Sequence, residues 1–173
     1  MTNMDPRLVD WFADEEDEGD APELHLVGLR PGDLERSFAV LVELGARWSD
    51  RTFHIDDEEI DVTVPERPEV AALVAAGRVT RPCLGAAGIA VDGVELPLVE
   101  MFLSPEEIEF FWWPDPEWST ERVAAFFALL ARLLALAPQA MLRVDPRYQP
   151  SSRRELGDLI APLVGDRVED GRS

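Results

Sequence analysis

The sequence contains no lysine, because all 16 of its lysine-or-arginine positions are arginine. Without lysine the chain has no Schiff-base nucleophile, no lysine general base and no lysine to hold phosphates in a P-loop. Histidine and cysteine are also scarce, with two of the former and one of the latter. A lone Cys83 cannot form an intrachain disulfide or a cysteine-based zinc site. These absences exclude several chemical classes and name no activity.

Acidic residues outnumber basic ones by 35 to 16, which gives a formal net charge of −19. The excess lies in two segments, since residues 1–66 carry a net −14 and residues 92–121 a net −9. A field of this sign repels nucleic-acid phosphates and anionic lipid surfaces. We therefore predict no nucleic-acid and no membrane partner and expect a basic protein partner. Solubility alone is the competing explanation for the charge.

The hydrophobic stretches are too short to predict a membrane span. The most apolar one, Val123–Ala137, has 15 residues with Arg132 inside it, whereas a bilayer needs roughly 20. The N-terminal residues lack the basic start and apolar run of a secretory signal. We expect a cytoplasmic protein whose 173 residues suffice for one domain with its own core.

The order of predicted elements indicates an α+β fold in a single domain, with a mostly antiparallel sheet packed with about five helices. One hairpin is expected over residues 51–64, and a three-stranded meander over 84–113, where Asp92-Gly93 is the strongest turn signal. The helices are expected near residues 5–14, 33–44, 68–76, 119–137 and 151–164. Further strands are expected at 23–29 and 140–144.

Three parts of the chain differ in composition. Residues 1–22 are interpreted as an N-terminal helix and an acidic linker, because "DEEDEGDAP" holds six acids in nine residues beside glycine and proline. Residues 23–164 are expected to form the globular α+β domain. Residues 165–173 are predicted to be a flexible tail.

The stretch "IEFFWWPDPEW", residues 108–118, concentrates the aromatic residues. Strand alternation places apolar side chains on both of its faces. A strand of this kind is typical of a sheet centre that is covered on both sides. We therefore expect Phe110, Phe111 and Trp112 in the core.

Two tryptophans of this stretch, Trp113 and Trp118, lie past the expected strand end. Tryptophan is enriched in interface hot spots, and acidic neighbours suit an arginine- or lysine-rich partner. The predicted partner-binding residues are Trp113, Asp115, Glu117, Trp118, Glu106, Glu107 and Glu109. An alternative interpretation makes Asp115 a helix cap and Trp118 a staple at the start of the next helix.

No catalytic motif is recognisable. His25 and His54 are expected on strands, and with Cys83 they offer a thiolate–imidazole pair that no surrounding signature supports. The acidic run after His54 lacks the glycine and the spacing of a calcium loop. We predict no catalytic residue, no metal site and no cofactor.

Three hypotheses for function follow from these observations. The first is a non-catalytic acidic protein that binds and masks a basic protein partner, most concretely a bacterial immunity protein or antitoxin that neutralises a toxin. The alternative is a small enzyme or ligand-binding protein with a site near the two histidines. The third is a nucleic-acid mimic, which needs carboxylates at phosphate-like spacing.

Overall fold

The computed structural model describes residues 4–13, 21–145, 147 and 150–169. These residues contain five helices, which agrees with the α+β prediction. The helices are α1 Pro6–Ala13, α2 Pro31–Glu43, α3 Val70–Ala75, α4 Thr120–Leu136 and α5 Pro150–Val164. Most of the acidic linker, residues 14–20, lies outside the described residues.

A seven-stranded sheet forms the centre of the molecule, and its neighbours are antiparallel except for one parallel pair at an edge. In spatial order the strands are β11 Val168–Glu169, β10 Met141–Val144, β1 Glu23–Val27, β9 Glu107–Phe111, β8 Val99–Ser104, β5 Cys83–Ala87 and β2 Arg47–Trp48. Strands β5, β8 and β9 form the predicted meander.

Two short hairpins stand apart from this sheet: β3 Thr52–Ile55 with β4 Ile60–Thr63, and β6 Ala90–Val91 with β7 Val94–Glu95. The second is inserted between two strands of the meander, and its turn is the predicted Asp92-Gly93. Both turn residues have positive φ, 51° and 84°, which is the conformation that a type I′ hairpin turn requires.

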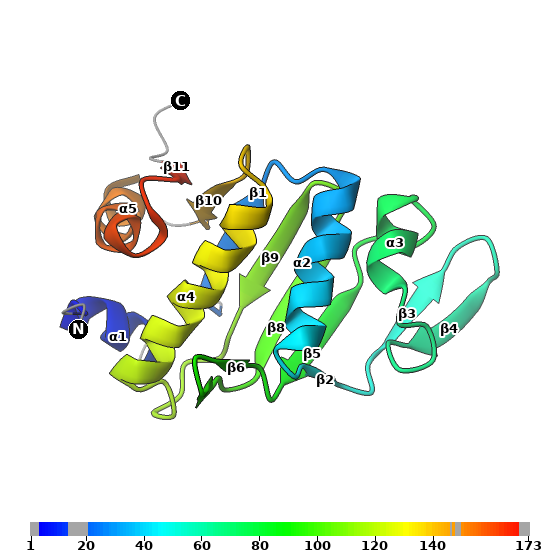
Figure 1. Ribbon diagram of the computed structural model, residues 1–173, viewed down its shortest axis with the longest axis horizontal. Coiled ribbons are helices and arrows are strands. Elements are labelled where there is room, and N and C mark those ends of the chain that lie inside the picture. The colour runs from blue at the N-terminus through cyan, green and yellow to red at the C-terminus, as the bar shows by residue number, and fades with distance from the viewer. Residues whose placement is uncertain (1–3, 14–20, 146, 148–149, 170–173) are drawn as a thin grey trace.

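The five described helices form one layer over one face of the sheet (Figure 1). Helices α2 and α4 cross in front of the strands, α1 and α5 pack against α4, and α3 packs against α2. No described helix covers the opposite face, which we call the open face. The expectation that the strand at 108–113 is covered on both sides by other elements is therefore wrong.

An aromatic cluster joins the helical layer to the sheet. The Phe12 ring of α1 stacks on Trp112, with centroids 4.1 Å apart and planes 5° from parallel, and both lie near Trp118 and Phe126. All four side chains are buried. Helix α1 thus shares the core of residues 23–164 rather than standing outside it.

Phe110 and Trp112 lie in the hydrophobic core, which confirms the core prediction for them, whereas Phe111 is buried on the open face, where it stacks on Phe102. The flexible-tail prediction is wrong for Val168–Glu169, which pairs in parallel with β10 as the edge strand β11. An edge strand of two residues has too little sequence to show a strand pattern. Residues 170–173 lie outside the described residues. Within the described chain, no helix has the length and apolarity required to cross a bilayer.

Candidate functional site

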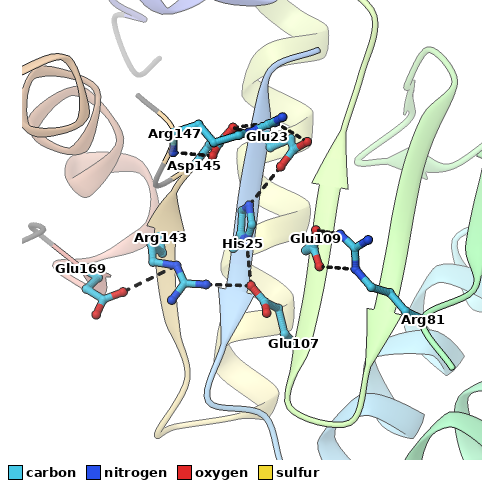
Figure 2. Close-up of polar contacts among 9 residues, drawn as sticks. All are labelled: Glu23, His25, Arg81, Glu107, Glu109, Arg143, Asp145, Arg147 and Glu169. Carbon is cyan, nitrogen blue, oxygen red and sulfur yellow. Dashed lines mark hydrogen bonds and ion pairs between the residues drawn. The ribbon is translucent and has the colours of Figure 1, made fainter. Parts of the chain in front are cut away.

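The open face carries a compact set of charged side chains from four strands and two loops. Strand alternation sends Leu24 and Leu26 of β1 toward the helices and His25 to the open face. His25 is directly opposite Arg143 of β10 and Glu109 of β9, and Glu109 is opposite Phe102 of β8. One row of side chains therefore runs across four neighbouring strands, and Figure 2 shows its members Arg143, His25 and Glu109.

Glu109 is only 8% exposed although no described helix covers it. Arg81, from the turn before β5, donates to both of its carboxylate oxygens at 3.1 and 2.5 Å. The same guanidinium lies over the Phe102 ring, 4.1 Å from the centroid, where it gains a cation–π contact. The Arg81 side chain therefore covers Glu109 on this face, and we call a side chain in this role an arginine lid.

Glu100 of β8 is buried in the same manner at 2% exposure. It forms an ion pair with the guanidinium of Arg51 and accepts a hydrogen bond of 3.0 Å from the Trp113 indole Nε1. Arg51 also donates to the Cys83 sulfur at 2.8 Å. Burial raises the pKa of the Cys83 thiol, and the positive charge of Arg51 offsets only part of that rise. The neutral thiol is the wrong form for a nucleophile.

His25 occupies the centre of the network and is 7% exposed. Its Nδ1 lies 2.6 Å from Glu107 and its Nε2 lies 3.2 Å from Glu23. Burial by itself lowers the pKa of the imidazole, but the hydrogen bond and charge of Glu107, with the charge of Glu109, raise it above its ordinary value. A ring between two carboxylates donates from both nitrogens only when it is protonated.

The partner carboxylate shifts in the opposite direction. The hydrogen bond from His25 holds the pKa of the Glu107 carboxyl below its ordinary range, and the charges of His25 and Arg143 act in the same direction. Arg143 Nη2 lies 2.9 Å from the same carboxylate. Glu107 is therefore ionised and doubly paired.

One group of donors on this face has the spacing of metal ligands. Single ligand atoms of Glu23, His25 and Asp145 all lie within 4.8 Å of one another, the one such group among the described residues. Imidazole and carboxylate together suit a divalent transition metal. In the structure a guanidinium already supplies the positive charge, since Arg147 Nη2 lies 2.5 Å from Glu23 and 2.7 Å from Asp145 (Figure 2).

Sequence reasoning missed this network because its members come together only through strand pairing. Glu23 and His25 alternate on one strand, which the sequence shows. Nothing in the sequence shows that β10 pairs with β1 and so brings Arg143 and Asp145 beside them.

The predicted partner-binding residues do not form one surface. Trp118 is 1% exposed and sits in the aromatic cluster, so its assignment to a binding surface is wrong. The physical reason is that Trp118 packs back on the core at the start of α4, as the staple part of the alternative interpretation proposed. The other part is wrong, because the N-cap of α4 is Ser119 and not Asp115.

The acidic members of the prediction fall into two groups at opposite ends of β9. Glu106 is exposed at the turn before this strand, whereas Asp115 and Glu117 are exposed after it. A strand of five residues separates its ends by about 16 Å. Glu107 and Glu109, between the two ends, are engaged by arginines.

Trp113 is the one predicted aromatic residue that the structure exposes. Its side chain is 63% exposed, while its indole nitrogen is held by Glu100. It therefore offers an apolar surface in a fixed orientation at one end of the open face.

The two histidines do not share a site. His25 lies in the central sheet and contacts Glu107 and Glu23, whereas His54 lies in the separate β3–β4 hairpin and contacts Asp61 at 2.9 Å. Figure 1 shows that hairpin beyond β2 and α3, away from β1. The expectation of one pocket around both histidines is wrong.

Comparisons with known proteins give no relative: no family model, no curated protein and no solved structure matches the chain.

Proposed function

We propose that this protein is a non-catalytic binding protein that masks a basic protein partner, most concretely a bacterial immunity protein or antitoxin that neutralises a toxin. The observation that supports this function best is the pairing of exposed apolar and exposed acidic groups around Trp113. The acids of the His25 network contribute less, because arginines already pair with them.

Trp113 has an apolar neighbour on the same face. Glu100 and Phe111 are directly opposite in the β8–β9 pair, and Leu98 and Trp113 lie just past the ends of the two strands on that side of the pair. Leu98 is 50% exposed, and a Cβ built on Gly85 would lie 3.6 Å from its Cδ1. Two of the four exposed large apolar side chains of the described residues thus lie past the same end of the β8–β9 pair.

Acidic side chains follow Trp113 closely along the chain. Asp115 and Glu117 are exposed, and Asp115 Oδ1 accepts a hydrogen bond of 2.6 Å from the Glu117 backbone N–H. The loop is therefore fixed by its own contacts, and both carboxylates are exposed, although that of Glu117 also forms a long ion pair of 3.7 Å with Arg122. A basic partner would place an apolar group against Trp113 and a guanidinium or ammonium group against these acids.

The total charge supports the same type of partner. A net charge of −19 raises the encounter rate with a basic protein at low ionic strength. The Trp113 indole loses little freedom on binding because Glu100 already orients it, and preorganised groups contribute more to affinity. Charge then governs mainly association, and the Trp113 contact mainly dissociation.

The test is affinity capture with matched variants. The immobilised protein is exposed at low salt to lysate of the organism that encodes it, and bound proteins are eluted with a salt gradient and identified by mass spectrometry. We expect one basic protein at high recovery, at least about tenfold less of it with Trp113→Ala, and unchanged recovery with Ile60→Ala. Ile60 is a matched control because it is 40% exposed on β4, away from this face.

Two results would contradict the proposal. One is that no basic protein is retained. The other is that Trp113→Ala and Ile60→Ala retain the partner equally, which would place binding elsewhere. Once a partner is identified, its own toxic activity gives the second readout, which the unmodified protein should suppress and Trp113→Ala should not.

A further inference from the structure

A groove between α2 and α3 lies in the helical layer and takes no part in the open face. It encloses about 430 Å³. Its apolar lining comes from Phe38, Ala39 and Val42 of α2 and from Ala71 and Ala72 of α3. The floor of the groove is well packed, since Phe38 is 6% exposed and its ring stacks on that of Trp48 with centroids 4.6 Å apart.

Val42 distinguishes this groove from an ordinary seam between packed helices. Its side chain is 50% exposed, which makes it one of four exposed large apolar side chains among the described residues. Ala39, one turn earlier on the same helix face, is exposed as well. An apolar surface left open beside a packed floor is what a docking groove for an amphipathic segment presents.

The rim of the groove is acidic at both ends. Glu35 and Glu43 line it from α2, and Glu69 lines it from the N-terminal side of α3. Among the described residues, no ion pair or hydrogen bond engages the side chains of Glu35 and Glu43, whereas Glu69 accepts from Arg67 at 2.7 Å. No arginine lines the groove.

The spacing of the rim acids defines the ligand. Glu35 and Glu43 are eight residues apart on one helix, which separates them by about 12 Å along its axis. A helix lying in the groove would match them with two basic residues at i and i+7 and would fill the space between with apolar residues at i+3 and i+4. A second copy of this chain fits poorly, because two such acidic surfaces repel each other.

We infer that the α2–α3 groove binds a cationic amphipathic helix of a partner protein. Val42 and Ala39 would contact the apolar stripe of that helix, while Glu35 and Glu43 would pair with its basic residues. This inference does not rest on the role of Trp113, since the two surfaces lie in different layers of the molecule.

The test uses a defined peptide. The probe is a helical peptide of roughly 20 residues with arginine at i and i+7, leucine at i+3 and i+4, and alanine or glutamine elsewhere. Amide shifts are followed by NMR during titration of the full-length protein, and affinity is measured by calorimetry. We expect the largest shifts over α2 and α3, and no binding of the same peptide with glutamate in place of arginine.

Variants assign the contacts. Val42→Arg should weaken peptide binding at least about tenfold, because it adds a repelling charge and removes apolar contact. The double variant Glu35→Gln/Glu43→Gln should weaken it and reduce its salt dependence. Ile60→Arg is the matched control, since it places the same charge at an exposed apolar residue of β4 that neither lines the groove nor belongs to the surface around Trp113, and it should leave peptide affinity unchanged.

Three outcomes would overturn the inference. The first is the absence of binding, and the second is an equal loss with Val42→Arg and Ile60→Arg, which would indicate non-specific charge attraction. The third is a protein dimer in sedimentation that Val42→Arg dissociates, which would make a second copy the occupant. Capture of a basic partner that depends on Trp113 is unaffected by any of these results, so the two proposals fail separately.

Discussion

The two faces of the central sheet are closed in different ways. On the helical face, Leu24, Phe110 and Met101 are each fully buried beneath elements that the chain folds over them (Figure 1). On the open face, Glu100 and Glu109 are nearly as buried, and the groups that cover them are the half-exposed arginines Arg51 and Arg81. On this face, therefore, single arginine side chains and not helices bury the carboxylates.

The difference matters because the two kinds of burial are stabilised by different forces. Apolar burial under helices gains from the hydrophobic effect and from close packing, and neither involves a titrating group or an ion pair that salt can screen. A buried carboxylate under an arginine is stable only while its counter-charge is in place. The helical face should thus contribute most of the stability of the fold, whereas the contribution of the open face should change with salt and pH.

The largest expected effect tests the helical face. Trp112→Ala should lower the free energy of unfolding by about 3–5 kcal/mol, because it opens a cavity in the aromatic cluster. Its neighbour Trp113, 63% exposed, serves as the matched control, and Trp113→Ala should cost below about 1 kcal/mol. Urea unfolding followed by circular dichroism measures both. Equal losses would mean that the open face contributes as much to the fold as the helical face.

An intermediate effect is expected from removing an arginine lid. Arg81→Met leaves Glu109 buried without a partner and should lower the free energy of unfolding by about 1–2 kcal/mol, since water reaching this half-exposed position moderates the loss. The double variant Arg81→Met/Glu109→Gln should recover part of it. The matched control is Arg78→Met, whose partners Asp57 and Glu58 remain in water.

The losses of stability in the two arginine variants should depend differently on salt concentration. The loss in Arg78→Met should disappear at high ionic strength, because it reflects repulsion among exposed acids. The loss in Arg81→Met should persist, because desolvation of Glu109 is not screened by salt. If both losses vanish together, Glu109 is solvated in solution and the arginine does not act as its lid.

The sequence predicted the elements well where their signals are local. The Asp92-Gly93 turn, the long helix expected over 119–137 and the buried stretch at 110–112 depend on neighbouring residues, and the structure bears each of them out. The α+β class followed from their order. Each of these features can be read within a window of a few residues.

The candidate site could not be predicted from such short windows of sequence. The arginine lids reach Glu100 and Glu109 from positions 49 and 28 residues away, and the pairing of β10 with β1 joins segments far apart in the chain. Trp118 shows the same limit in reverse, since its sequence context suits both an exposed loop and a staple, and only its packing on Phe12 and Phe126 decides between them. Residue type identified the candidate groups, and tertiary contacts decided which are free to bind.

The smallest expected effect is on the pH dependence of stability. Only the open face should contribute a term to stability that changes as its groups titrate. Because the folded-state pKa of His25 is raised, the imidazolium contributes stability fully below its unfolded pKa of about 6.5, and that contribution is lost as pH rises through the folded value. Glu107, whose folded-state pKa is lowered, contributes above its unfolded pKa of about 4.3 and loses its contribution as pH falls through the folded value. Stability from the pair should therefore be greatest between these limits.

Urea unfolding from pH 4 to pH 9 tests this expectation with two variants. His25→Gln should remove the decline in stability on the alkaline side, because no group at this position then releases a proton. Leu26→Val, the adjacent position on the helical face, should lower the curve by about 1 kcal/mol at every pH without changing its shape. A His25→Gln curve parallel to that of the unmodified protein would show that the imidazole is not held between its carboxylates, and the open face would then be no more sensitive to pH than the helical one.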